Sequence, residues 1–242
     1  MVYNKRNTLL SEVAVKYTTL LFDADDTLLD FGKSEKEAVR DCLISRGLPS
    51  TDDIIARYSE INQLHWKMLE RGEISRERLY VERFAAFCRE LGFVCDAQKF
   101  SEDYLTALST KSYLIDGALQ MCEQLSHTYR MYVVTNGNAT VQHGRFDPSP
   151  IARYFERSFI SEEMGSAKPA IEFFDKVFVN IPDFEPSKTL IIGDSLTSDI
   201  QGGINAEIDT CWYNPKRKSA PDGMEITYTA YNYDEIMDLL LG

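Results

Sequence analysis

Residues 18–28 read TTLLFDADDTL, and the fold prediction starts from this segment. Its first five residues are a short, mainly apolar run that is too short for a helix and ends at Asp23, which is typical of a strand buried on both faces. Two similar runs, 131–135 and 189–192, end at Asn136 and Gly193. Residues 158–160, 210–213 and 226–229 are weaker strand candidates. Helical patterns lie between several of these runs, including one behind Pro169. This alternation predicts an α/β fold: a doubly wound, mainly parallel, Rossmann-like sheet with helices on both sides.

The interval between the first two strong strands is too long for a single crossover helix. It contains four helical patterns and no convincing strand. Ser34-x-x-Glu37 has the form of a capping box that opens the first helix, and Ser75 precedes the third. We therefore expect residues 32–112 to form an α-helical domain, inserted into a sheet domain made of residues 17–31 and 113–242.

Composition excludes several classes of partner. The 242 residues carry 26 Lys and Arg against 38 Asp and Glu, a net charge of −12. This charge argues against a nucleic-acid polymer or an anionic membrane as partner, but a small phosphate ester can still bind through a few local groups and a metal. The apolar runs are shorter than a membrane span, and the N-terminal stretch before Tyr17 lacks the features of a signal peptide. Nothing in the sequence indicates an oligomeric state.

The cysteines bear on the compartment. Five cysteines are scattered along the chain without a C-x-x-C pair. We interpret them as buried, reduced thiols, which predicts a cytoplasmic protein.

Two motifs at strand ends suggest chemistry on phosphorus. Asp23 and Asp25 can converge on one point, where one carboxylate attacks and the other handles the leaving-group proton. The simpler alternative is an acidic loop that caps the next segment. After the second strong strand, the hydroxyl of Thr135 and the backbone N–H of Asn136 can hold phosphoryl oxygens, although an ordinary turn explains most isolated T-N-G triplets.

Two later motifs suggest a cation and a metal ligand set. Lys168 precedes Pro169 at a predicted helix start, where a positive charge is unfavourable unless an anion is near; alone, it would be a surface lysine. Asp194 and Asp199 follow the third strong strand and suit a hard cation, with helix capping as the alternative. Together the four motifs fall at the sheet edge where open α/β sheets bind ligands. A shared ligand site explains this coincidence better than four separate structural roles.

The order D-x-D-x-T, T-N-G, K-P and G-D-x-x-x-x-D resembles the haloacid dehalogenase (HAD) superfamily from about Tyr17 to the C-terminus. Residues 22–31 (FDADDTLLDF), 65–84 (HWKMLERGEISRERLYVERF) and 133–146 (VVTNGNATVQHGRF) resemble its pyrimidine 5′-nucleotidase subfamily. One departure is the pair Pro148 and Pro150, which should shorten the helix before them.

The resemblance implies roles for the motif residues. Asp23 would attack phosphorus to give an aspartyl-phosphate, and Asp25 would protonate the leaving oxygen and then activate water. Mg²⁺ would be held by Asp23, the backbone carbonyl of Asp25, Asp194 and, directly or through its neighbours, Asp199. The non-transferred phosphoryl oxygens would be bound by three residues: Thr135, Asn136 and Lys168.

The resemblance implies a Mg²⁺-dependent phosphatase for small phosphate monoesters, with nucleoside 5′-monophosphates as the expected substrates. Alternatives are a phosphatase for phosphoglycolate or a sugar phosphate, a phosphomutase, and a 2-haloacid dehalogenase, which needs neither metal nor a second acid and is disfavoured by Asp25 and Asp194. A phosphorylatable receiver domain would be about half as long, and a non-catalytic module would have lost a motif aspartate.

The resemblance also implies that the helical insertion, residues 32–112, is a cap domain over a catalytic core, and that this cap selects the substrate. The cap helices break near residues 71–75. Trp66, Arg78 and Arg83 could contact a base or ribose there, or could serve ordinary packing and surface ion pairs. The three histidines have no partner at metal-ligand spacing and are interpreted as structural.

Overall fold

The computed structural model describes residues 16–242; residues 1–15, which hold most of the stretch expected to lack a signal peptide, lie outside the described residues. Six strands form one sheet in the order β3-β2-β1-β4-β5-β6, and every neighbouring pair is parallel. All six predicted strands are therefore confirmed, with small shifts at their ends. The strands are β1 (Thr19–Phe22), β2 (Arg130–Thr135), β3 (Arg157–Ile160), β4 (Thr189–Gly193), β5 (Asp209–Tyr213) and β6 (Tyr228–Ala230).

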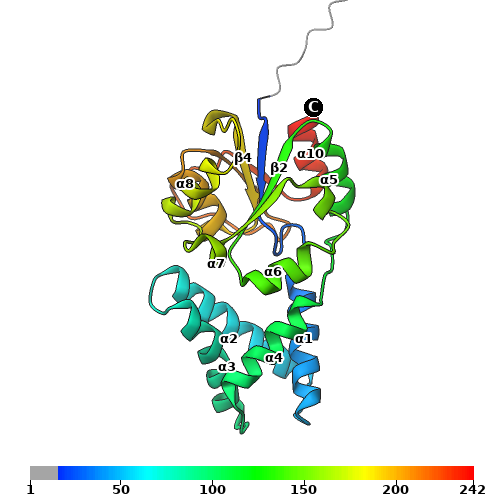
Figure 1. Ribbon diagram of the computed structural model, residues 1–242, viewed down its shortest axis with the longest axis vertical. Coiled ribbons are helices and arrows are strands. Elements are labelled where there is room, and N and C mark those ends of the chain that lie inside the picture. The colour runs from blue at the N-terminus through cyan, green and yellow to red at the C-terminus, as the bar shows by residue number, and fades with distance from the viewer. Residues whose placement is uncertain (1–15) are drawn as a thin grey trace, which may run out of the picture.

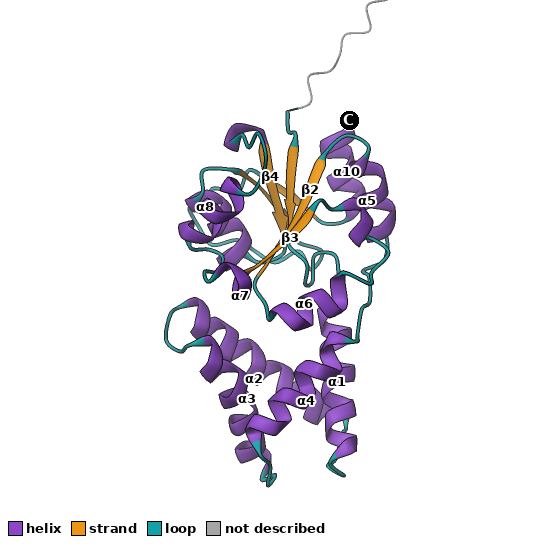
Figure 2. Cartoon of the chain, in the orientation of Figure 1, coloured by secondary structure: helices purple, strands orange, loops and turns teal. Residues whose placement is uncertain are grey.

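Helices cover both faces of the sheet, which confirms the doubly wound α/β class (Figures 1 and 2). Alternate residues of β1 point to opposite faces: Leu20 belongs to the apolar cluster that contains α5 (Ala118–Ser126) and α10 (Tyr233–Leu241). Leu21 belongs to the cluster that contains α8 (Ile171–Val179). The remaining helices beside the sheet are α6 (Ala139–Phe146), α7 (Ser161–Met164) and α9 (Gln201–Asn205).

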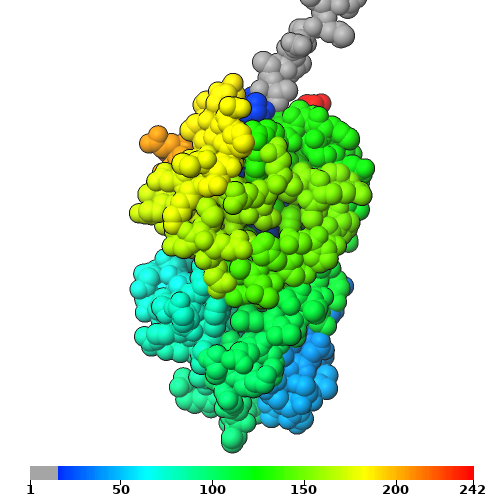
Figure 3. All heavy atoms as spheres, in the orientation of Figure 1, coloured from blue at the N-terminus to red at the C-terminus, as the bar shows by residue number. Residues whose placement is uncertain are grey.

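Four helices between β1 and β2 form a separate bundle at one end of the sheet, beyond α6 (Figure 1). They are α1 (Phe31–Ser45), α2 (Asp52–Glu70), α3 (Arg76–Leu91) and α4 (Ala97–Ser109). Tyr58, Phe84 and Tyr104, which come from α2, α3 and α4, are fully buried in one aromatic cluster. The space-filling view shows the bundle and the sheet region as two lobes in contact (Figure 3).

The predicted capping box at Ser34 is wrong. Helix α1 begins at Phe31, and Asp30 caps it by accepting a hydrogen bond from the N–H of Lys33 at 2.8 Å. Ser34 lies inside the helix, where its hydroxyl donates to the carbonyls of Asp30 (2.9 Å) and Lys111 (3.0 Å). The helix therefore starts four residues earlier than the pattern indicated. Ser75 does cap α3, as expected.

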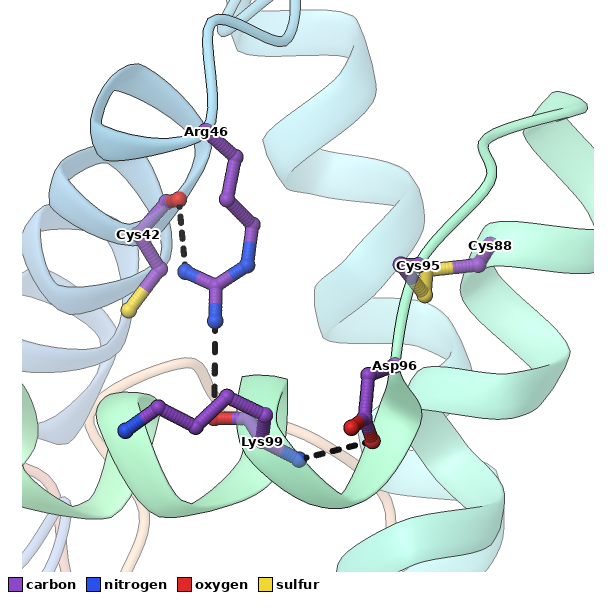
Figure 4. The surroundings of a disulfide bond; sticks show 6 residues. All are labelled: Cys42, Arg46, Cys88, Cys95, Asp96 and Lys99. Carbon is purple, nitrogen blue, oxygen red and sulfur yellow. Dashed lines mark hydrogen bonds between the residues drawn. A yellow bond between two sulfur atoms is a disulfide. The ribbon is translucent and has the colours of Figure 1, made fainter.

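The expectation of five reduced thiols is also wrong for one pair. Cys88 and Cys95 form a disulfide with their Cα atoms 6.4 Å apart (Figure 4). Cys42, Cys122 and Cys211 are free and buried. Gly92 ends α3 in the left-handed conformation, with φ of 69°, and so turns the chain back toward Cys88. Sequence spacing could not reveal this approach, because it depends on that turn. The cytoplasmic location stays a prediction without the support of these two thiols.

Two further features bear on the sequence analysis. Helix α6 ends at Phe146, as Pro148 and Pro150 predict. Within residues 16–242, no helix combines the length and the apolar character that crossing a membrane requires.

Candidate active site

The predicted motif residues come together at the carboxyl end of three adjacent strands. Asp23 follows β1, Thr135 ends β2 and Asp194 follows β4. Strand β1 lies between β2 and β4, with Phe22 in register with both Val133 and Ile192. The three side chains therefore lie side by side, and all three line one cavity of about 220 Å³.

Lys168 is buried among acceptors, so it is no surface lysine. Its side chain is 1% exposed, and its Nζ donates to Asp23 Oδ1 (2.7 Å), Asp199 Oδ1 (2.6 Å) and the carbonyl of Val134 (2.6 Å). Helix α8 begins only at Ile171, so a loop carries Lys168. The side chain of Asn136 fixes this loop by bonding both the N–H (2.9 Å) and the carbonyl (2.8 Å) of Lys168.

Both carboxylates that bind Lys168 belong to a cluster of three. One carboxylate oxygen each from Asp23, Asp194 and Asp199 lies within 4.8 Å of the others. Burial, together with the charges of Asp23 and Asp199, raises the pKa of Asp194 to about 8. Burial also raises the pKa of Asp23, against the opposing effect of the Lys168 charge. Full ionisation of the cluster would therefore place more negative charge here than Lys168 can balance.

The donor set fits Mg²⁺. All of the clustered ligands are carboxylate oxygens, which a hard divalent cation prefers. Within the described residues, the carboxylate of Asp194 accepts no hydrogen bond, while its backbone is held by Thr27 (3.1 Å) and Trp212 (2.9 Å). Both oxygens of Asp199 are already used, one by Lys168 and the other by the N–H of Ser195 at 3.0 Å. Asp194 and Asp23 are therefore the carboxylates best placed to hold the ion, with Asp199 beside them.

Asp25 is held by two residues that the sequence analysis did not single out. One of its carboxylate oxygens accepts from Arg145, and the other accepts from Gln142 Nε2 at 2.7 Å. Arg145 is fully buried and also donates to the carbonyl of Lys111 at 3.1 Å. The one sequence signal for this pair is the spacing of three residues, which puts Gln142 and Arg145 on the same face of α6.

The glycine of the T-N-G motif leaves room for this arrangement. A Cβ atom at Gly137 would lie 2.7 Å from Gln142 Nε2 and 2.9 Å from its Cγ. Any larger residue would therefore push Gln142 away from Asp25. The T-N-G motif thus contributes to the position of Gln142 beside Asp25, in addition to placing the hydroxyl of Thr135.

The cap closes over this edge through its α2–α3 end. Glu70 accepts from the hydroxyl of Thr197 (3.0 Å), and Arg76 donates to the carbonyl of Gly137 (3.0 Å) and the hydroxyl of Ser161 (2.8 Å). Trp66 lines two cavities. One is the cavity of about 220 Å³ beside Asp23, and the other is a neighbouring cavity of about 400 Å³ between the cap and the loop of Lys168. The enclosed space has the size of a small organic leaving group.

The structure separates the three cap residues singled out from the sequence. Trp66 faces the site, and Arg83 is buried in the cap beside it. Arg78 is exposed and paired with Glu82 at 2.6 Å, away from the site. Among the histidines, His65 is buried against the carbonyl of Ile61, and His143 lies between Asp147 and Glu163. Neither histidine belongs to the acidic cluster.

This sheet edge, with a buried lysine among aspartates, defines a hydrolytic α/β site. A family model described as haloacid dehalogenase-like hydrolase matches residues 17–207. The chain belongs to this family, and it is an enzyme of the hydrolase class.

Several relatives extend over nearly the whole chain. The HAD-hydrolase YfnB of Bacillus subtilis is 39% identical over 93% of this chain and 96% of its own length. Its crystal structure, bound to magnesium, has a TM-score of 0.89 and covers 93% of this chain and 99% of that chain. The pyrimidine 5′-nucleotidase PynA of Streptococcus pneumoniae is 37% identical, covering 93% of this chain and 95% of its own. The pyrimidine 5′-nucleotidase YjjG of Escherichia coli is 28% identical over 93% of this chain and 99% of its own.

Proposed function

We propose that this protein is a Mg²⁺-dependent phosphatase that acts on nucleoside 5′-monophosphates through an aspartyl-phosphate at Asp23. The observation that carries the proposal is the position of Asp23 between Lys168 and Asp194 at the floor of the cavity. In this proposal residues 32–112 act as the cap domain, and residues 17–31 with 113–242 act as the catalytic core.

Each motif residue has a distinct task. Lys168 holds Asp23 Oδ1, which leaves the other oxygen of that carboxylate to attack phosphorus in line. Thr135, the backbone of Asn136 and Lys168 bind the phosphoryl oxygens that are not transferred. Bound Mg²⁺, held by Asp23, the Asp25 carbonyl and Asp194 beside Asp199, would offset the negative charge of the phosphoryl group.

Asp25 moves the protons. It protonates the leaving oxygen in the first step and takes a proton from water in the second, when the aspartyl-phosphate is hydrolysed. Arg145 and Gln142 orient its carboxylate from α6. The residues of the cap that lie over the cavity exclude bulk water during both steps.

Three observations support a nucleotide as substrate. The relatives PynA and YjjG are pyrimidine 5′-nucleotidases. The catalytic cavity of about 220 Å³ and the neighbouring cavity of about 400 Å³ together have room for a nucleoside, and Trp66, which lines both, can stack on a base. The net charge of −12 disfavours a nucleic-acid polymer.

The test is phosphate release from UMP, dTMP, AMP, glucose 6-phosphate and phosphoglycolate. We expect pyrimidine nucleotides to have the highest kcat/KM, EDTA to abolish turnover and Mg²⁺ to restore it. Asp23→Asn should be inactive because it lacks the nucleophile.

Other outcomes discriminate among the alternatives. A preference for glucose 6-phosphate or phosphoglycolate would reject the nucleotidase and keep the phosphatase. Return of phosphate to the substrate rather than to water would indicate a mutase. Full turnover in the presence of EDTA would reject the proposed Mg²⁺ dependence and favour a dehalogenase-type site.

A further inference from the structure

A small cavity between the cap and α6 gathers buried polar atoms that have no partner. Four of the seven buried side-chain nitrogen and oxygen atoms that lack a hydrogen bond within residues 16–242 line this one cavity. They are Nε and Nη2 of Arg83, Oε1 of Gln142 and the hydroxyl of Tyr104, which also has the hydroxyl of Tyr58 as a neighbour. These residues come from α3, α4 and α6 and are 2%, 0% and 3% exposed. Because buried polar groups are nearly always paired, this concentration indicates a ligand.

Arg83 is held rigidly while two of its N–H groups stay available. Its Nη1 donates to Asn62 Oδ1 at 2.8 Å, and Asn62 Nδ2 donates to Glu35 at 2.6 Å. Its guanidinium carbon lies 4.9 Å from the ring centre of Tyr104. Contacts with α1, α2 and α4 therefore fix the guanidinium in advance, which reduces the entropic cost of binding.

Gln142 supplies an acceptor of defined orientation. Its amide nitrogen Nε2 donates to the carboxylate of Asp25 at 2.7 Å. The amide oxygen is therefore the atom left without a partner in the cavity. The cavity thus offers N–H donors from Arg83, one hydroxyl from Tyr104 and one acceptor from Gln142.

This small cavity adjoins the catalytic cavity. Its volume is about 30 Å³, room for one small polar group rather than a ring. It shares Asp25, Trp66 and Asn136 with the catalytic cavity. A ring that lies against Trp66, with its phosphate at Asp23, can therefore insert one edge here.

We propose that Arg83, Tyr104 and Gln142 form a specificity subsite for the edge of a leaving group that carries a carbonyl next to an N–H. This inference rests on the proposed nucleotidase function and names its preferred base. Uracil and thymine have such an edge: the carbonyl accepts from Arg83, and the ring N–H donates to Gln142 Oε1. Cytosine has nearly the same size but no N–H at that ring nitrogen, so it would leave Gln142 unpaired.

The test compares three substrates on four proteins. UMP, CMP and ribose 5-phosphate, which has no base, are assayed as kcat/KM on the wild type, Arg83→Lys, Tyr104→Phe and Arg78→Lys. Arg83→Lys keeps the charge near Glu35 and removes the fork of donors. Arg78→Lys makes the same change at an exposed position of the same helix and is the matched control.

We expect the wild type to favour UMP over CMP by about 10-fold or more. Arg83→Lys should lower kcat/KM for UMP by about 10–100-fold and bring the UMP to CMP ratio close to one, because bonds to the charged guanidinium are lost. Ribose 5-phosphate should change by less than about 3-fold, since it does not reach the subsite. Tyr104→Phe should show a smaller loss on UMP, and Arg78→Lys should match the wild type.

Binding of uridine, measured by calorimetry, reports the subsite without the reaction. It should weaken in Arg83→Lys and stay unchanged in Arg78→Lys. If Arg83→Lys fails to fold, the proposal is still tested by Tyr104→Phe and by the ratio of kcat/KM for UMP to kcat/KM for CMP in the wild type.

Two results would overturn the subsite while leaving the phosphatase intact: equal kcat/KM of the wild type for UMP and CMP, or an equal loss on UMP and ribose 5-phosphate in Arg83→Lys. Absence of nucleotide turnover by the wild type, with other esters hydrolysed, would reject the nucleotidase function itself and this ligand with it.

Discussion

Arg145 joins Asp25 to both chain segments that connect the cap with the core. Besides Asp25, its guanidinium bonds the carbonyl of Lys111 (3.1 Å) and the hydroxyl of Ser34 (3.4 Å). The hydroxyl of Ser112 in turn donates to the carbonyl of Arg145 at 2.5 Å. The position of the Asp25 carboxylate is therefore tied to the position of the linkers.

Replacing Arg145 should affect proton transfer more than phosphorus chemistry. Arg145→Lys keeps a positive charge but cannot hold the same three acceptors with one ammonium group. We expect kcat for a nucleotide to fall by about 10–100-fold, part of the effect of a general acid. Turnover of p-nitrophenyl phosphate, whose phenolate leaves without a proton, should fall less. Arg153→Lys, at an exposed position, is the control, and an equal loss on both substrates would contradict the positioning role.

Helix α6 packs directly against the cap helix α4 at Gly144. A Cβ atom at this glycine would lie 2.5 Å from the backbone carbonyl oxygen of Ser109. A backbone atom cannot move aside as the tip of a side chain can. The glycine therefore sets how closely the cap approaches the core.

Gly144→Ala should force these two helices apart. The overpacking should cost about 1–3 kcal/mol of unfolding free energy, more than the gain of about 1 kcal/mol that alanine brings to a helix. Gly32→Ala is the matched control, since a Cβ in this first turn of α1 meets nothing closer than 3.7 Å. Urea unfolding of both variants gives the comparison. Equal stability of the two would show that the contact relaxes freely.

At the scale of the whole molecule, the acidic cluster links stability to pH. The pKa of Asp194 is about 8 in the folded, metal-free protein, whereas an unfolded aspartate titrates near about 4. The folded state therefore binds more protons between these values, and its stability falls as the pH rises from about 4 to about 8.

Mg²⁺ should reverse this loss because it binds the deprotonated carboxylates. We expect the difference in Tm between Mg²⁺ and EDTA samples to grow from about pH 6 to about pH 8. Thermal unfolding at several pH values measures it, with Asp194→Asn as the variant that should lose most of the difference. A difference independent of pH would be inconsistent with this linkage.

The sequence predicted those features that are encoded locally. The strands were recognisable because a parallel strand buried on both faces reads as a continuous apolar run, as in β4. Asp23 and Asp194 were recognisable because they follow such runs directly. Gln142 and Arg145 were not, because their partner Asp25 is 117 and 120 residues away and only the packing of α6 brings them to it. The disulfide and the true start of α1 likewise depend on turns whose geometry the composition does not reveal.

The segments that enter and leave the cap run side by side. The N–H of Asp30 donates to the carbonyl of Tyr113 (2.9 Å), and the N–H of Ile115 donates to the carbonyl of Leu28 (3.0 Å). Because the two ends of the insertion lie next to each other, its length and shape can change without moving the strands of the sheet. During evolution, the stretch between Asp30 and Tyr113 can therefore be lengthened, shortened or exchanged while Asp23, Lys168 and Asp194 keep their positions. The shape of the space over the site can then change without any change in the site itself.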